Sequence, residues 1–266
     1  MLNLSMNESP NDDSMKRFYT KIHESMTSNA DIFKAPYPTQ KEFRQFIIDY
    51  YKSDLSRLII LDAGCGGTAV NSISCSLYGF SKIYAFDLNL DNINHVNKIL
   101  KNNPNTKSIF LVNGSILSPP FKSVAFDFII CHGVIHHLSD PAAAIKQLYN
   151  ILKPKGRLFV SLYCFENSWF ENIVRVWRFF GKTIPYRVMH FAFHKFPLIN
   201  NFVLDFMYVP ILWVFKEKEA ISILKDIGFS IEKNYCSAVD PFYGKSFFKK
   251  SVSGDGILRN FVCCKH

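Results

Sequence analysis

The sequence contains no apolar run of the roughly 20 residues that a membrane-spanning helix needs. The nearest candidate, residues 202–215, is interrupted by Asp205 and Pro210. Residues 1–13 are polar and lack the apolar core of a secretory signal peptide. These absences favour a soluble protein, which we expect in the cytoplasm.

The seven cysteines show neither the spacing of a metal site nor that of a disulfide framework. Only Cys263 and Cys264 are adjacent, and neighbouring cysteines rarely form a bridge. The sequence therefore predicts free thiols, as in a reducing cytosol, and no metal centre.

No basic block accompanies the net charge of +9, which comes from 31 Lys and Arg residues against 22 Asp and Glu residues. A basic chain can bind nucleic acid or a membrane surface, but the charges are scattered in short groups such as Lys249 and Lys250. No nucleic-acid-binding module is recognisable. We therefore expect a solvated basic surface and no nucleic-acid partner.

Strand and helix patterns alternate from residue 57 onward. Apolar runs predict strands at 58–61, 82–86, 108–112, 126–131, 157–163, 229–235 and 257–263. Amphipathic patterns predict helices at 70–78, 90–100, 141–152 and 216–227, with Asp140 as an N-cap, Gly228 as a stop and a turn at 153–156. Repeated units of this length indicate an α/β fold with a doubly wound, Rossmann-like, mostly parallel sheet of seven strands.

Two segments stand outside this alternation. Residues 1–54 are expected to form an N-terminal helical lid, frayed over 1–14, with a clear amphipathic helix at 41–51. Residues 164–215 are expected to be an inserted helical cap between the two parts of the main domain, 55–163 and 216–266.

The predicted cap is rich in aromatic residues and carries several arginines. They include Trp169, Trp177, Trp213, Arg175, Arg178 and Arg187. These residues can form an ordinary core, shape a pocket for a bulky acceptor, or contact a membrane that holds a lipid-like acceptor. We favour a cap that also shapes the acceptor pocket.

Glycine and acidic residues gather at the predicted strand ends. The first strand runs through Asp62 into a turn with Gly64 and Gly66, where the missing side chain lets a ligand approach the backbone. Asp87 ends the second strand, where a carboxylate can bind ribose hydroxyls, and Ser115 follows the third strand. These ends meet at one edge of a sheet and predict a nucleotide-like cofactor. A dinucleotide also fits, but the third glycine of its fingerprint is absent.

Three motifs in order resemble those of the class I S-adenosylmethionine-dependent methyltransferases. They are Leu-Asp-Ala-Gly-Cys-Gly at 61–66, Phe-Asp-Phe-Ile-Ile-Cys-His-Gly-Val-Ile-His-His-Leu at 126–138, and Leu-Lys-Pro-Lys-Gly-Arg-Leu at 152–158. The resemblance covers residues 55–163 well and 216–264 loosely. The sequence departs from it at Thr68, where the family usually has glycine, and at Ser115, where relatives often carry aspartate.

The resemblance implies S-adenosylmethionine as the cofactor and a role for each matching residue. Asp62 would lie near the methionine ammonium, with Gly64 and Gly66 along the methionine backbone. Asp87 would bind the ribose hydroxyls. The other implied contacts are Leu88 beside the adenine, Ser115 at its edge, Ile116 on its ring, and Cys131 and His132 at the sulfonium end.

His136 and His137 follow the fourth strand, at the face toward which the methyl group should point. Histidine titrates near neutral pH, so one of them could act as a general base for the acceptor. The alternative, that the pair caps the next helix or packs against the loop, stays open.

The cofactor motifs and the aromatic cap predict an enzyme that transfers a methyl group to an oxygen, nitrogen or carbon atom of a bulky, largely apolar small molecule. The alternatives are a tRNA or protein methyltransferase, a protein that binds S-adenosylmethionine without catalysis, and, least favoured, a nicotinamide oxidoreductase. Nothing in the sequence indicates the oligomeric state.

Overall fold

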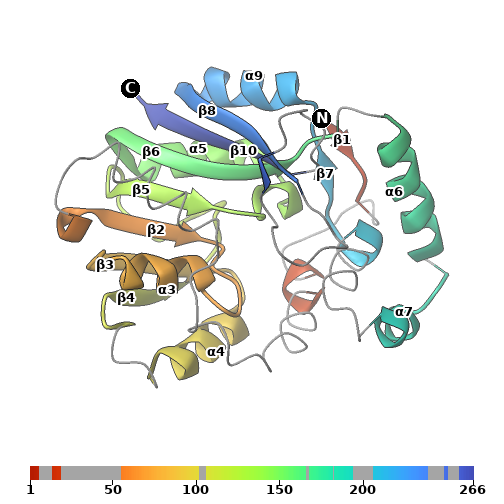
Figure 1. The fold of residues 1–266 in the computed structure, drawn as a ribbon, viewed down its shortest axis with the longest axis horizontal. Helices are drawn as coiled ribbons and strands as arrows, with labels where there is room; N and C mark the ends of the chain where they lie inside the picture. Colours follow the sequence, from red (N-terminus) through yellow and green to blue (C-terminus); the bar gives the residue numbers. More distant parts are fainter. Residues whose placement is uncertain are drawn as a thin grey trace.

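The chain, seen as a computed structural model, is built on an open sheet with helices on both of its faces (Figure 1). The structure describes residues 1–5, 14–18, 55–101, 106–165, 168–181, 183–193, 206–238, 249–250 and 258–266. The helix predicted at 41–51 and most of the predicted lid lie outside these residues.

The central sheet has the strand order β4-β3-β2-β5-β6-β10-β8-β9. Its strands are β2 (Ile59–Ala63), β3 (Lys82–Asp87), β4 (Ile109–Asn113), β5 (Phe126–Cys131), β6 (Leu152–Tyr163), β8 (Phe229–Ala238), β9 (Lys249–Lys250) and β10 (Leu258–Lys265). The strands from β4 to β6 pair in parallel, and β10 runs antiparallel between β6 and β8. The predicted mostly parallel sheet of seven strands is confirmed, with the two-residue β9 added at its edge.

Four helices of the described residues cover the sheet, and each face of the sheet has its own apolar core. The helices are α3 (Val70–Leu77), α4 (Leu90–Lys101), α5 (Pro141–Ile151) and α9 (Glu217–Ile227). Buried residues of α3 and α4, such as Ile73 and Val96, pack in one cluster. Those of α5 and α9, such as Leu148 and Leu224, pack in the other. The central strands are continuous apolar runs because both of their faces are covered.

The ends of two helices follow the signals in the sequence. Asp140 Oδ1 accepts a hydrogen bond from the backbone N–H of Ala143 at 2.9 Å, as an N-cap does. Gly228 ends α9 with a φ of 114°, a left-handed conformation that favours glycine. Both predicted end signals are therefore confirmed.

The predicted turn at 153–156 is wrong, because strand β6 already begins at Leu152. The pairing of β5 with β6 shifts register across this segment, and Lys155 takes a positive φ of 61°. Lys153 Nζ contacts Asp127 Oδ2 at 2.7 Å, which holds the segment against β5. Proline and glycine close together indicate a turn from sequence, but here they belong to an irregular, bulged strand.

The N-terminal residues are not all frayed, contrary to the prediction for 1–14. Strand β1 (Leu2–Asn3) pairs antiparallel with β7 (Trp213–Val214) in a separate two-stranded sheet. The backbone N–H of Leu4 also donates to the carbonyl of Leu212 at 2.8 Å. The partner lies at a distant point of the sequence, so no local pattern could indicate this strand.

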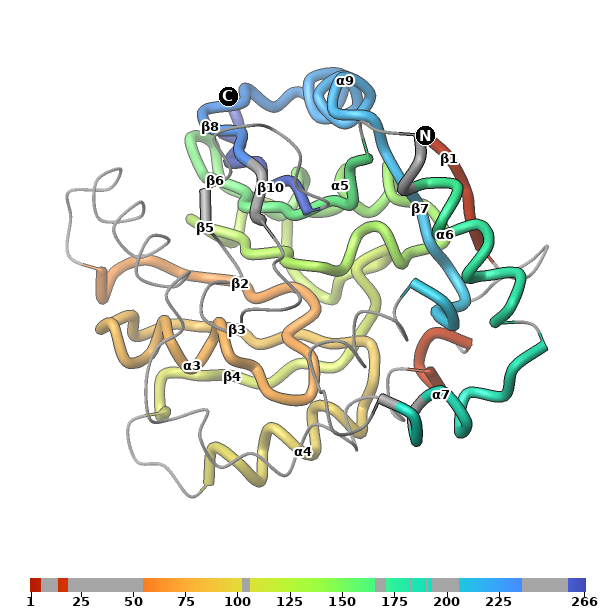
Figure 2. The backbone as a smooth tube through the Cα atoms, turned by 45° about the vertical axis from the view of Figure 1, so that its right-hand side comes forward, coloured from red at the N-terminus to blue at the C-terminus, as the bar shows by residue number. Residues whose placement is uncertain are grey.

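Two further helices, α6 (Ser168–Gly181) and α7 (Tyr186–Phe193), lie at one side of the layered domain (Figure 2). The buried Arg178 guanidinium donates to the carbonyls of Phe206 at 3.0 Å and Val209 at 2.7 Å, which attaches α6 to the segment before β7. The segment predicted as a helical cap thus also contains strand β7.

The tryptophans of this segment differ in their surroundings. Trp177 packs against the buried residues of a third apolar cluster, and Trp213 Nε1 donates to the carbonyl of Leu138 at 2.9 Å. The side chain of Trp169 lies outside the described part of the structure. Among the described residues, no helix has both the length and the apolar character needed to cross a membrane.

Candidate cofactor and acceptor site

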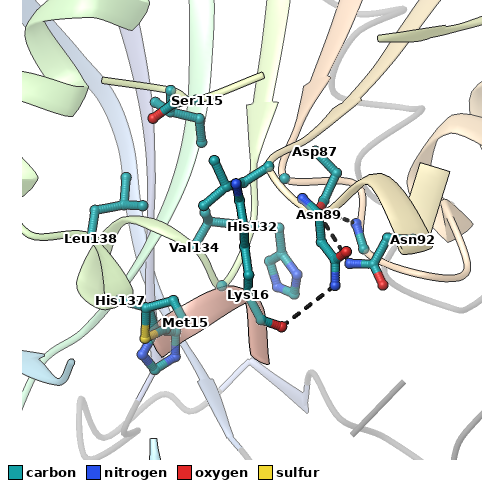
Figure 3. Close-up of a pocket in the computed structure, with 15 residues that line it drawn as sticks. Met15, Lys16, Asp87, Asn89, Asn92, Ser115, His132, Val134, His137 and Leu138 are labelled. Atoms are coloured by element: carbon teal, nitrogen blue, oxygen red, sulfur yellow. Dashed lines mark hydrogen bonds between the residues drawn. The ribbon is translucent and has the colours of Figure 1, made fainter. Parts of the chain in front are cut away.

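A cavity of about 230 Å³ lies at the carboxyl ends of strands β2 to β5 (Figure 3). Open α/β sheets bind their ligands at this edge. The cavity is lined by Met15, Lys16, Gly64, Gly66, Asp87, Leu88, Asn89, Asn92, Ser115, Ile116, His132, Gly133, Val134, His137 and Leu138. All except Met15 and Lys16 come from the strand ends or from the loops and helix starts that follow them.

The glycine turn after β2 is held close to two neighbouring segments. The backbone N–H groups of Gly64 and Cys65 donate to the carbonyl of Phe86 at 2.8 and 3.0 Å. Gly64 has a φ of +82°, and a Cβ added to it would lie 2.4 Å from Val134 Cγ2. Glycine is therefore required here by both the backbone conformation and the loop after β5.

We expect Gly64→Ala to lower the free energy of unfolding by about 2–5 kcal/mol. The left-handed conformation costs an alanine about 1–2 kcal/mol, and overpacking against Val134 costs about 1–3 kcal/mol more. Gly79→Ala is the matched control, because Gly79 has a φ of +95° but no atom within 4 Å of an added Cβ. Urea unfolding measures both variants, and equal losses would show that the contact with Val134 is unimportant.

Asp87 connects the glycine turn to the start of α4. Its Oδ2 accepts from the backbone N–H of Gly66 at 2.9 Å. Its Oδ1 accepts from the backbone N–H of Asn89 at 2.8 Å and from Asn92 Nδ2 at 3.1 Å. Figure 3 shows Asn89 and Asn92 beside Asp87. These donors orient the carboxylate at the cavity wall, where the sequence predicted a ribose-binding group.

Asp62 and Cys131 do not line the cavity, although the family resemblance implied that both lie beside the cofactor. Asp62 is 1% exposed, and its Oδ2 accepts from Ser72 N at 3.1 Å and Ser72 Oγ at 2.7 Å. Burial raises the pKa of Asp62 to about 6 despite these hydrogen bonds. Cys131 is fully buried in the core, which raises the pKa of its thiol. Asp62 therefore anchors α3 to β2, because its carboxylate faces the helix and not the cavity.

The residues implied around the adenine do line the cavity. Leu88, Ser115 and Ile116 are all in its wall. Asn113 holds this region together, since its Nδ2 donates to the carbonyls of Asp87 at 2.9 Å and Leu88 at 3.0 Å. Ser115 Oγ accepts from Leu117 N at 3.2 Å, so this hydroxyl also shapes the turn after β4.

The two adjacent histidines occupy different environments. His137 lines the cavity, and its Nδ1 lies 2.9 Å from the carbonyl oxygen of Ile211. A carbonyl oxygen only accepts, so the proton of neutral His137 lies on Nδ1 and Nε2 keeps its lone pair. His136 is fully buried, with its ring centroid 3.8 Å from that of Tyr163. Of this pair, only His137 therefore lines the cavity, and its role as a base stays a prediction.

His132 also lines the cavity and stacks on Phe159 with ring centroids 6.1 Å apart. The surrounding protein disfavours the imidazolium and lowers the pKa of His132 to about 4, although part of the ring faces the cavity. The ring is therefore neutral at pH 7 and does not repel a cationic ligand.

This pKa predicts a pH-dependent stability. Between pH 6.5 and about 4 the unfolded chain protonates His132 while the folded chain does not. As the pH is lowered through this window, the free energy of unfolding of the parent should therefore decrease relative to that of His132→Gln. The decrease should reach up to about 1.4 kcal/mol per pH unit. The raised pKa of Asp62 acts in the opposite direction, but Asp62 is present in both proteins. Urea unfolding across this window measures the difference, and parallel pH profiles would contradict the prediction.

Several residues of the cavity wall escaped the sequence analysis. Asn89 carried a signal, because an asparagine before a predicted helix often caps it, and its Oδ1 accepts from Asp91 N at 2.9 Å. Met15 and Lys16 belong to the segment predicted as a lid, but no motif marks them individually. Their place is set by packing, including a contact of Asn89 Nδ2 with the Lys16 carbonyl at 3.5 Å.

Residues 61–160 match the family model described as a methyltransferase domain. A ubiquinone biosynthesis O-methyltransferase from Rickettsia akari is 31% identical over 115 residues, which are 43% of this chain and 44% of the relative. A demethylmenaquinone methyltransferase from Lactiplantibacillus plantarum is 25% identical over 130 residues, 47% of this chain and 53% of the relative. The chain spans about half of the length of the curated relatives it matches.

Solved structures share the fold over nearly the whole chain. The cyclase SpnF has a TM-score of 0.64 at 12% identity and covers 97% of each chain. The magnesium protoporphyrin IX methyltransferase from Synechocystis, solved with bound S-adenosylhomocysteine, has a TM-score of 0.57 at 16% identity and covers 96% of this chain and 94% of its own. At such identities the likeness shows the fold alone. Residues 61–160 thus form a methyltransferase domain by the family model, and the chain shares the fold of S-adenosylmethionine-dependent methyltransferases.

Proposed function

We propose that this chain transfers the methyl group of S-adenosylmethionine to an oxygen, nitrogen or carbon atom of a largely apolar small molecule. The observation that carries the proposal is a single cavity that contains both the oriented carboxylate of Asp87 and the imidazole of His137. The Asp87 carboxylate suits the cofactor, and the His137 imidazole suits an acceptor that has to lose a proton.

The residues of the cavity wall fit S-adenosylmethionine. The Asp87 carboxylate can accept hydrogen bonds from a ribose diol, and the apolar side chains of Leu88 and Ile116 can flank a flat base. Neutral His132 tolerates the positive sulfonium. The bound cofactor supplies an electrophilic methyl group, so the protein mainly has to align the acceptor and exclude water.

An apolar acceptor is supported by the residues next to the cavity. Tyr163 lies against His136 and packs against Phe206, with ring centroids 4.8 Å apart. Phe18, near the cavity residue Met15, contacts Tyr186 of α7 edge-to-face at 6.5 Å. The two relatives named for ubiquinone and menaquinone chemistry also favour an acceptor with an apolar ring.

Calorimetric titration is the first test of this proposal. S-adenosylmethionine and S-adenosylhomocysteine are expected to bind at micromolar concentration, and NAD is expected not to bind. Tight binding of NAD instead would favour an oxidoreductase and overturn the proposal.

The second test measures transfer of a labelled methyl group to a panel of acceptors. The panel holds hydroxylated benzoquinols and naphthoquinols, bulk tRNA and bulk protein. Transfer to an apolar quinol supports the proposal, whereas transfer to tRNA that weakens with salt would favour the RNA alternative. Tight cofactor binding with no transfer to any acceptor would favour a non-catalytic protein. The last outcome is a real alternative because one fold hosts many functions.

A further inference from the structure

The outer faces of α6 and α7 expose large apolar side chains that the core does not use. Val176, Phe179 and Phe180 of α6 are 52%, 67% and 47% exposed, and Val188 and Phe191 of α7 are 55% and 77% exposed. We call these five residues the outer patch. Monomeric proteins seldom expose so many large apolar residues together without a binding role.

The outer patch is separate from the side of α6 that packs inward. Val174 is fully buried, and the buried Arg178 binds the carbonyls of Phe206 and Val209. Val176, Phe179 and Phe180 are spaced by three and four positions, so they share one face of the helix. Helix α6 is thus attached to the rest of the protein through one face, and its other, apolar face lies in solvent.

The charges around the outer patch are mainly positive. Arg175 and Arg187 are exposed on α6 and α7, and Glu171 is the one acidic residue in the sequence from 168 to 193. Glu171 contacts Arg175 at 3.1 Å and Lys216 at 3.9 Å. A second copy of this chain would bring like charges together, whereas an anionic lipid surface would attract them.

We propose that the outer patch docks this protein on an anionic lipid bilayer, with the phenylalanines inserted at the headgroup boundary and the arginines near the phosphates. Helices with aromatic residues on one face and basic residues beside them bind membranes in this way. In both views α6 and α7 form the margin of the molecule away from the sheet (Figures 1 and 2). The outer patch therefore lies on helices at the periphery of the described structure.

The position of α7 links this surface to the cavity. Tyr186 of α7 contacts Phe18, and Phe18 belongs to the same short helical segment as the cavity residue Met15. Among the described residues, α7 and residues 14–18 thus connect the outer patch to the cavity wall. An acceptor dissolved in the bilayer would thus have a short route to the cavity, a step that rests on the proposed function.

Co-sedimentation with large unilamellar vesicles tests the docking directly. The probes are vesicles of phosphatidylcholine alone and of phosphatidylcholine mixed with phosphatidylglycerol. We expect the protein to bind the anionic vesicles about tenfold more tightly, and this preference should weaken with added salt. The double variant Phe179→Ser/Phe191→Ser should lose about tenfold or more in binding.

Leu77→Ser is the matched control, because Leu77 is 42% exposed on α3 in the main domain. It should bind vesicles like the parent protein. Equal binding by the double variant, or no binding of the parent to anionic vesicles, would overturn the proposal. A parent dimer that the double variant converts to a monomer would assign the outer patch to self-association and also overturn it. Calorimetry with S-adenosylhomocysteine shows whether the double variant is folded, and it reports on the proposed function independently of the vesicles.

Discussion

His137→Ala is expected to lower kcat by about 100-fold or more for an acceptor that must lose a proton, because a positioned base contributes about 10²–10⁴-fold. Because Nδ1 donates to the Ile211 carbonyl, the ring lone pair that would accept that proton is on Nε2. Affinity for S-adenosylhomocysteine should stay nearly unchanged, since the residues implied around the cofactor lie elsewhere in the wall. Single-turnover kinetics and calorimetry measure the two quantities.

Chemical rescue distinguishes a base from a packing residue. Added imidazole should restore part of the activity of His137→Ala. His136→Phe is the comparison, because His136 is buried against Tyr163 and is expected to change stability more than turnover. Normal turnover of His137→Ala would remove the general base from the proposed mechanism.

Asp87→Ala is expected to weaken binding of S-adenosylhomocysteine by about 100-fold or more. Each hydrogen bond to a charged group contributes about 1.5–3 kcal/mol, and a ribose diol offers two donors. The backbone N–H of Gly66 and Asn92 Nδ2 would also lose their acceptor, which loosens the turn that lines the cavity.

Asp91→Ala is the matched control for this prediction, since it removes an exposed carboxylate from the first turn of α4 without touching the cavity wall. Calorimetry measures affinity, and thermal unfolding confirms that both variants fold. Affinity of Asp87→Ala close to that of the parent would exclude Asp87 from cofactor binding.

The layered domain was predictable because its signals are local. Buried parallel strands such as β2 and β5 are short apolar runs, and glycine or an acidic residue follows them where the chain must turn. Asp140 caps the start of α5 through a local hydrogen bond, and Gly228 ends α9 through its own backbone conformation. The positions of Asp87 and Ser115 at the cavity follow from the parallel order of the strands.

The remaining features depend on contacts between distant segments. Asp62 has the residue type and position of a cofactor ligand, yet Ser72 donates two hydrogen bonds to its carboxylate. Only the packing of α3 reveals these bonds. The histidine pair separates in the same way, because Tyr163 packs against His136 while the Ile211 carbonyl orients His137. Strand β1 and the cavity residues Met15 and Lys16 are likewise fixed by distant partners. The lid predicted for 1–54 stays a prediction.

The pairing of β1 with β7 has a consequence for the order of folding. Leu2 meets Val214, so the chain must be synthesised beyond β7 before β1 finds its partner. Closing so long a loop is entropically costly, and this contact gains nothing until the main domain has formed. Residues 2–3 thus settle late, although they are made before the main domain. A nascent chain can therefore form the sheet edge that lines the cavity first and pair β1 only after β7 has emerged.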